Sequence, residues 1–367
     1  MEKLIFHLRS DGASGRHPEG DELWRKRKLW EINAELHAAL KDSKDLIDDF
    51  HKTNFWDTFK KLSNTYETVN TSPIYTPVSR SFFKLWEMMQ DFSDTLSTNE
   101  PMTVAFLAEG PGGFIEAFWK FRSHPSRDHI HTITLRSADK RVPQLRLLRE
   151  MHGHVHVSYG ADGTGDLYLL HNVEHFVRQM GGEATCNLVC ADAGFDFSGD
   201  FNNQELMSLR LLCAEVYTAF RLQRPGGAFV LKVFDIFCPE TMGLIQCILD
   251  AYNDVYIVKP LTSRPANSEK YLVCTGFTGA SREVIDKLEH CMLTGEFLVP
   301  DVAIHLMSQL IEFNVSSVTR QILYIIKTIV CIDNNASHPD LLQHLSKLHS
   351  DASRRWCTEY GEMPARH

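Results

Sequence analysis

Short apolar runs alternate with amphipathic stretches through the middle of the chain. Each run has the length and residue types of a buried strand, and each stretch repeats its apolar positions at helical spacing. The predicted strands, seven in number, span 103–109, 129–135, 154–159, 186–192, 226–234, 254–259 and 270–277. This alternation predicts an α/β fold with a doubly wound, mostly parallel sheet. The last two runs are joined by a loop without a helix, so we expect the last strand to be antiparallel.

Helical patterns flank this central region on both sides. Upstream, apolar residues recur at helical spacing in 21–42 and again in 79–92. Downstream of the last predicted strand the pattern is helical throughout. We therefore expect an N-terminal helical extension over 1–75, a central α/β domain over 76–278 and a C-terminal α-helical extension over 279–367.

Two further apolar stretches predict helices. Residues 142–151 predict a helix between the second and third strands. The most apolar helical pattern, 321–332, is shorter than the length that crosses a bilayer and is interrupted by Lys327. The first residues turn polar at once, unlike a secretory signal. We therefore predict that the protein does not insert into a membrane.

The charge balance excludes a general electrostatic attraction to nucleic acid. The 367 residues carry a formal net charge of −9, and 43% of them are hydrophobic, as in globular proteins. Any RNA binding must therefore use a local basic groove. Candidate clusters lie at 25–28, at Lys60 and Lys61, and at 140–149, although most such runs are solvated helix faces.

Histidine and cysteine spacing gives little support to a metal site. His152, His154 and His156 would share one face of a strand, which could suit a metal, but the same alternation fits a half-exposed edge strand. We therefore predict no metal. The nine cysteines include none before Cys186 and no CxxC pair, which predicts a reducing compartment.

A lysine interrupts one of the most apolar strands. Lys232 lies within "GGAFVLKVFD" (226–235), where an ammonium is costly unless it is paired or loses its proton. Asp192, at the end of the fourth strand, and Glu269, before the seventh, are plausible partners. A buried ion pair that only fastens the sheet is the structural alternative. If Lys84 joins these three residues in one cleft, their pKa values should be driven apart.

Two glycine-rich turns follow predicted strands at the edge where open α/β sheets bind nucleotides. "AEGPGGF" (108–114) opens a helix, whose N-terminus can hold a carboxylate or phosphate. A nicotinamide fingerprint is disfavoured, because Ile115 stands where a small residue is needed and no acid closes the second strand. The turn therefore favours a different adenosine cofactor. The second turn, 160–168, carries Asp162 and Asp166, which could bind adenine or ribose or form an ordinary turn.

The motifs together resemble the FtsJ-type ribose 2′-O-methyltransferases, and within them the cap-specific mRNA (nucleoside-2′-O-)-methyltransferases that make cap 1. The resemblance covers roughly residues 60–278. It rests on "SRSFFKLWE", "AEGPGGFIEAFW", "YGADGTGDLY", "ADAGFDFSGDFNNQE", "GGAFVLKVFDIF" and "KPLTSRPANSEKYLVC", in family order. It implies a Rossmann-like, S-adenosylmethionine-dependent methyltransferase fold. The implied reaction methylates the ribose 2′-hydroxyl of the first transcribed nucleotide of capped mRNA.

The resemblance also implies site residues. The catalytic tetrad falls on Lys84, Asp192, Lys232 and Glu269. The S-adenosylmethionine site falls on Ser79, Glu109, Gly110, Pro111, Gly112, Gly113, Phe114, Asp166, Leu167 and Asp192. Substrate contacts fall on Lys61, Asn202, Asn203, Gln204, Ser263, Arg264 and Glu269.

The implied mechanism makes Lys232 the general base that takes the proton of the 2′-hydroxyl. We expect burial and the ammonium of Lys84 to lower the pKa of Lys232 from its ordinary value of about 10.4, while Asp192 and Glu269 act in the opposite direction and position the lysine. Two alternatives stay open: a 2′-O-methyltransferase for another cap-proximal nucleotide or for ribosomal or transfer RNA, and a catalytically dead RNA-binding subunit. The expected location is the nucleus, or the cytoplasm for a viral enzyme, and the C-terminal helices could contact capping or transcription machinery.

Overall fold

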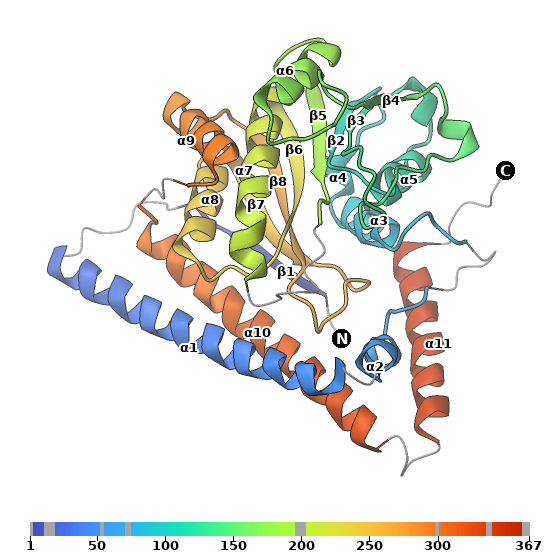
Figure 1. The fold of residues 1–367 in the computed structure, drawn as a ribbon, viewed down its shortest axis with the longest axis vertical. Coiled ribbons are helices and arrows are strands. Elements are labelled where there is room, and N and C mark those ends of the chain that lie inside the picture. The colour runs from blue at the N-terminus through green and yellow to red at the C-terminus, as the bar shows by residue number, and fades with distance from the viewer. Residues whose placement is uncertain are drawn as a thin grey trace.

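A mixed sheet of eight strands forms the centre of the computed structural model, which describes residues 3–10, 19–51, 55–69, 75–194, 203–297, 301–334 and 340–361. The strands are β1 (Leu4–Leu8), β2 (Thr103–Leu107), β3 (His129–Ile133), β4 (Val155–Ser158), β5 (Cys186–Ala191), β6 (Gln223–Val233), β7 (Tyr252–Lys259) and β8 (Lys270–Phe277). They lie in the order β1-β7-β8-β6-β5-β2-β3-β4 (Figure 1). Strands β4, β3, β2, β5 and β6 run parallel to one another, as the alternating pattern predicts.

Two strands run against the others. β8 lies between β6 and β7 and is antiparallel to both, which confirms the expectation for the last strand. β1 pairs antiparallel with β7 at the edge of the sheet, so the expected number of strands, seven, was wrong. The N-terminal extension is therefore not purely helical. Only Leu8 of β1 is fully buried, and pairing with a strand so distant in sequence leaves no local signal.

Helices cover both faces of the sheet. They are α1 (Glu19–His51), α2 (Phe55–Ser63), α3 (Ser81–Asp91), α4 (Ser93–Leu96), α5 (Gly113–Phe121), α6 (Leu170–Gln179), α7 (Gln204–Leu222), α8 (Pro239–Leu249), α9 (Arg282–Thr294), α10 (Ile304–Asn334) and α11 (Leu341–Tyr360). Alternate residues of each central strand enter different cores. In β2, Ala105 and Leu107 join the core beneath α6, α7 and α8, whereas Val104 and Phe106 join the core beneath α3, α5 and α11.

The segment between β3 and β4 is not the helix that its apolar residues predict. Residues 134–148 are irregular, and only a short 3-10 helix, η2 (Arg149–Met151), follows. The segment lies across the glycine turn, where the backbone N–H of Arg146 donates to the carbonyl of Pro111 at 2.9 Å. Leu145, Leu147 and Leu148 still pack on the core. Tertiary contacts therefore replace the internal hydrogen bonds that a helix would have made.

The long helices α1 and α10 lie side by side below the sheet (Figure 1). By length and composition alone, α10 could cross a membrane, which the sequence pattern did not anticipate. Eleven of its residues are nevertheless buried, and it packs on α1, α2, α8 and β1. In its most apolar stretch only 28% is buried within the structure, so these contacts cover only part of the helix.

The histidines near β4 do not form the predicted row. β4 begins at Val155, so His152 and His154 precede it and only His156 lies in the strand. The ring of His156 stacks on His131 with centroids 4.8 Å apart, and burial lowers the pKa of His131 to about 4. Among the residues that the structure describes, no group of three or more His, Cys, Asp or Glu side chains could hold a metal ion.

Candidate active site

Lys232 lies near the carboxyl end of β6, where the parallel strands of the sheet share one edge. Its side chain points to the α3 and α5 face, because its neighbours Leu231 and Val233 enter the opposite core. The ammonium nitrogen lies 3.1 Å from Oδ1 of Asp192 and donates to the Asp192 carbonyl at 2.9 Å. Asp192 follows β5 directly. The strand order thus brings together two residues far apart in sequence.

Lys84 and Glu269 form the second ion pair of the tetrad. Lys84 on α3 contacts the carboxylate of Glu269 at 2.8 Å, and Ser263 donates to the same carboxylate at 2.8 Å. Although burial opposes it, the ammonium groups of Lys84, Lys232 and Lys259 hold the pKa of Glu269 well below its ordinary value. Glu269 in turn acts electrostatically on Lys232, so the two pairs belong to one cluster.

The pKa of Lys232 moves in the direction opposite to the expectation from sequence. Burial lowers it, but Asp192, Glu269 and Glu215 raise it, and the carboxylates prevail, so the pKa lies above its ordinary value of 10.5. The expected depression was wrong because Lys84 is paired with Glu269 and three acids surround one lysine. Lys232 is therefore an ammonium in the resting protein.

Sequence reasoning missed two residues that act on the tetrad, one through a hydrogen bond and one through its charge. Tyr271, the register partner of Lys232 on β8, donates its hydroxyl to Oδ1 of Asp192 at 2.8 Å. Glu215 on α7 is fully buried, and burial raises its pKa to about 8 against the opposing effect of Lys232. Tyr271 resembles any apolar residue in a strand, and Glu215 resembles a surface acid of a helix. Neither position carries a local signature.

The first glycine turn is tightly packed at the start of α5. Gly112 has φ of 118°, and a Cβ on it would lie 2.9 Å from the carbonyl oxygen of Arg146. A Cβ on Gly113 would lie 2.2 Å from the hydroxyl oxygens of Ser79 and Ser81. Only glycine therefore fits where the turn meets α3 and the 134–148 segment.

Acidic side chains lie at the same edge of the sheet as the first glycine turn. Burial and the Asp192 carboxylate raise the pKa of Glu109 to about 8, while the N–H groups of Phe114 and Gly112 oppose the rise. In the second turn, Asp166 accepts from the N–H of Tyr168 at 2.8 Å, and the neighbouring Leu167 is buried. A helix N-terminus suits a carboxylate, and aspartates suit hydroxyl and amino groups. This set of groups fits S-adenosylmethionine, which offers all three.

Only some of the predicted substrate-binding residues contact the tetrad. Ser263 contacts the tetrad through Glu269, whereas Arg264 makes a two-pronged ion pair with Glu67, at 2.9 and 2.7 Å. Gln204 begins α7 and Asn203 precedes it. Asn202 lies outside the described residues. Lys61 is exposed on α2, which packs on α10, α1 and α11, and no described contact joins Lys61 to the tetrad.

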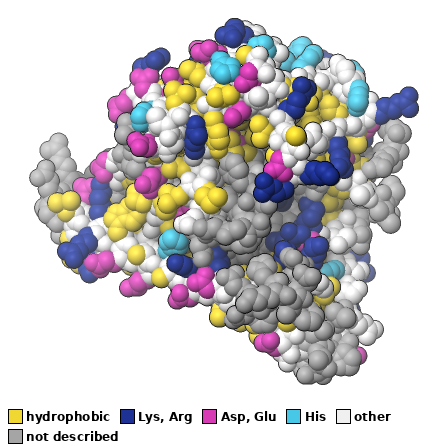
Figure 2. All heavy atoms as spheres, in the orientation of Figure 1, with side chains coloured by type: hydrophobic (Ala, Val, Ile, Leu, Met, Phe, Trp, Pro, Cys, Tyr) yellow, Lys and Arg dark blue, Asp and Glu magenta, His cyan; other side chains and the backbone are white. Residues whose placement is uncertain are grey.

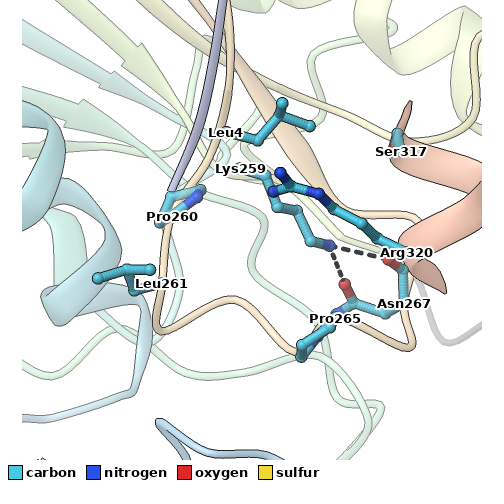
Figure 3. A pocket seen from close by; sticks show the side chains of 8 residues that line it. All are labelled: Leu4, Lys259, Pro260, Leu261, Pro265, Asn267, Ser317 and Arg320. Atoms are coloured by element: carbon cyan, nitrogen blue, oxygen red, sulfur yellow. Dashed lines mark hydrogen bonds between the residues drawn. The ribbon is translucent and has the colours of Figure 1, made fainter. Parts of the chain in front are cut away.

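A half-buried lysine supports the loop that leads to Glu269. Lys259, the last residue of β7, donates to the carbonyl and Oδ1 of Asn267 at 2.8 and 2.6 Å (Figure 3). It also donates to the carbonyl of Glu269. Burial lowers the pKa of Lys259 to about 7. A small pocket beside it is lined by Leu4, Lys259, Pro260, Leu261, Pro265, Asn267, Ser317 and Arg320.

The FtsJ-like methyltransferase family model matches residues 77–277, so the chain belongs to this family. Members of the family use S-adenosylmethionine, in agreement with the site. Among curated proteins, the chain is similar to the cap-specific mRNA (nucleoside-2′-O-)-methyltransferase 1 of Trypanosoma brucei brucei, with 35% identity over 214 residues, which are 58% of this chain and 56% of the relative. The protein of the same name from Danio rerio is 37% identical over 183 residues, 47% of this chain and 22% of the relative.

These matches cover only part of each relative, so the chain spans about half the length of the trypanosome protein and less of the fish protein. Among solved structures, a putative ribosomal RNA methyltransferase from Plasmodium falciparum matches 55% of this chain and 98% of its own, with 17% identity and a TM-score of 0.40.

Proposed function

We propose that the protein methylates the ribose 2′-hydroxyl of the first transcribed nucleotide of capped mRNA, converting cap 0 to cap 1. The proposal rests on two neighbouring ion pairs, Lys232 with Asp192 and Lys84 with Glu269. They lie beside the glycine turn of an FtsJ-like fold. The names of the relatives, which are cap-specific mRNA methyltransferases, favour the capped substrate.

Lys232 is the proposed general base. When bound, S-adenosylmethionine supplies an electrophilic methyl group on a sulfonium. Lys232 takes the proton of the 2′-hydroxyl, whose oxygen would accept that methyl group, with S-adenosylhomocysteine as the leaving group. Because the resting lysine is protonated, it must first release its own proton to solvent. General base assistance is typically worth about 10²–10⁴-fold.

The other three residues hold Lys232 in place. Asp192 fixes the ammonium nitrogen through its carboxylate and its carbonyl oxygen. Lys84 neutralises Glu269, which keeps a second carboxylate ionised beside the lysine. Alignment of the hydroxyl with the methyl group should supply much of the remaining rate enhancement.

The direct test is Lys232→Ala. We expect about 10²–10⁴-fold lower kcat with S-adenosylmethionine and RNA still bound. Lys120→Ala, which removes an ion pair with the half-exposed Glu150 outside the site, is the control and should keep normal turnover. Near-normal turnover of Lys232→Ala would overturn the assignment of the base.

Substrate choice needs a separate measurement. Methyl transfer to RNA with a 7-methylguanosine cap should greatly exceed transfer to uncapped RNA of the same sequence. Equal rates would favour the alternative, a ribosomal or transfer RNA 2′-O-methyltransferase. Failure to bind S-adenosylmethionine in calorimetry would favour a non-catalytic RNA-binding subunit.

Lys and Arg side chains gather around a hollow on one face of the molecule, although the net charge is −9 (Figure 2). Such a local concentration is what RNA binding by an acidic protein requires. Action on mRNA caps would place the protein in the nucleus of a cellular host, which a fluorescent fusion of the full chain can test.

A further inference from the structure

A second buried carboxylate lies one helical turn beyond Lys84 on α3. Glu87 is 0% exposed. It takes no part in the proposed chemistry, yet a buried carboxylate is costly unless its oxygens are satisfied. Its hydrogen-bond partners therefore show what the residue holds in place.

The first partners of Glu87 belong to the loop that leads to Glu269. Leu261 donates its backbone N–H to Oε2 at 2.7 Å. Thr262 donates its N–H at 3.0 Å and its hydroxyl at 2.6 Å to Oε1. The 260–268 loop thus begins on Glu87 and ends at Glu269, which Lys84 holds. One helix fixes both ends of the loop.

The remaining partners come from the two ends of the described chain. Trp356 on α11 donates its indole N–H to Oε1 of Glu87 at 3.1 Å. The ammonium nitrogen of Lys3, just before β1, lies 3.9 Å from Oε2 and donates to the hydroxyl of Tyr360 at 3.1 Å. The C-terminal helix and the catalytic loop therefore share one acceptor.

Every group that faces Glu87 is a donor, so a glutamine cannot replace it without loss. In Glu87→Gln, the amide NH₂ of the new side chain would face either the N–H of Leu261 or the three donors that meet at Oε1. Two donors that face each other leave at least one buried hydrogen bond unmade.

We propose that Glu87 is a positioning residue for the 260–268 loop, and that Trp356 completes the same cluster, so that α11 supports the active site from a distance. This inference rests on the proposed function and extends it to the role of the C-terminal helix. Displacing α11 should move Ser263 and Glu269 away from Lys84 and lower turnover without weakening cofactor binding.

The structure offers a matched control for Trp356. Trp86 on α3 also joins α3 to α11, because its indole N–H donates to the carbonyl of Tyr360 at 3.1 Å. Both indoles are buried in the same apolar core. Trp→Phe at either position removes one hydrogen bond and some volume from one interface, but only Trp356→Phe removes a donor to Glu87.

The experiment compares Glu87→Gln, Trp356→Phe and Trp86→Phe in the full chain. We measure kcat and KM for capped RNA, the Kd of S-adenosylmethionine, Tm, and hydrogen exchange of peptides that contain Leu261 and Thr262. We expect kcat to fall about tenfold in Glu87→Gln and about threefold in Trp356→Phe, with an unchanged Kd. Exchange of the two loop amides should accelerate in both variants and not in Trp86→Phe.

The inference is overturned if Trp356→Phe and Trp86→Phe change kcat and exchange equally, or if both variants of the cluster leave the loop protected. Thr262→Val removes one donor to Glu87 without touching α11, so it continues the test should Glu87→Gln fail to fold; it should lower kcat and accelerate exchange. If the unmodified protein does not methylate capped RNA, the proposed function fails, while hydrogen exchange still decides the role of Glu87.

Discussion

Lys232 keeps its proton because three carboxylates outweigh its burial. A base that is protonated at rest makes turnover dependent on the fraction of enzyme that has lost that proton. The sequence indicated which residues meet at this site. It did not indicate the direction of the pKa, because that direction depends on how Lys84 is paired and on Glu215, which lies in a helix.

The first prediction follows from this protonation state. Because kcat/KM reports the free enzyme, it should rise about tenfold per pH unit from pH 7 towards the pKa of Lys232. Initial rates at subsaturating capped RNA in buffers of constant ionic strength measure the slope. A level profile between pH 7 and 9 would show that Lys232 is not the base in the free enzyme.

The second prediction concerns Glu215, whose pKa is raised from 4.5 to about 8 by burial. The folded protein then binds a proton that the unfolded chain releases between these values. Stability from this group is complete below pH 4.5 and is lost as pH rises towards 8. The free energy of unfolding should therefore fall more steeply with rising pH in the unmodified protein than in Glu215→Gln. The difference in slope is at most about 1.4 kcal/mol per pH unit. Denaturant titrations at pH 5, 6 and 7 measure the difference, and parallel curves would contradict it.

At the scale of elements, the glycine turn depends on its neighbour. The 134–148 segment packs so closely on the turn that a Cβ at Gly112 would meet a backbone oxygen at 2.9 Å. The turn and the segment therefore form one unit, although a helix was expected in place of the segment.

The third prediction is that Gly112→Ala weakens S-adenosylmethionine binding and destabilises the protein. The positive φ alone costs about 1 kcal/mol, and the contact with Arg146 adds to that cost. Gly181→Ala is the control, because Gly181 has φ of 93° and nothing within 4 Å of a Cβ. Calorimetry and Tm measure the two effects. An equal loss of stability in both variants, with normal cofactor binding, would contradict the role of the packed turn.

The sequence predicted elements whose partners lie nearby and failed where distant contacts decide. The five parallel core strands were correct because buried apolar runs between helices have few other solutions. β1 was missed because its partner, β7, is remote in the chain. The helix over 142–151 was wrong because Pro111 supplies an acceptor that no local pattern reveals.

At the scale of the whole molecule, an acidic protein must concentrate its cations to hold RNA. Arg146 contacts the glycine turn, and Lys140 and Arg149 belong to the same 134–148 segment and the adjoining η2; all three side chains are exposed. The exposed Arg25, Arg27 and Lys28 on α1 form an equally charged cluster on a peripheral helix.

The fourth prediction compares these two clusters. Neutralising Lys140, Arg146 and Arg149 together should raise KM for long capped RNA and reduce its dependence on salt, by about one unit of log–log slope for each phosphate that is no longer neutralised. The same change at Arg25, Arg27 and Lys28 should alter neither. Titrations of KM between low and moderate salt decide the matter. Equal effects of the two triple variants would point to a diffuse attraction instead of a local groove.

The insertion of β8 between β6 and β7 has a consequence for biosynthesis. β7 leaves the ribosome before β8, the strand that joins it to the sheet. β1 is made before its partner β7 and can pair only once β7 is available. Such distant pairings make folding slow. Glu269 stands just before the strand that closes this gap, so Lys84 meets its partner only when the sheet is completed. A nascent chain that ends before β8 cannot therefore carry an assembled tetrad, and the appearance of activity during synthesis would report the completion of the sheet.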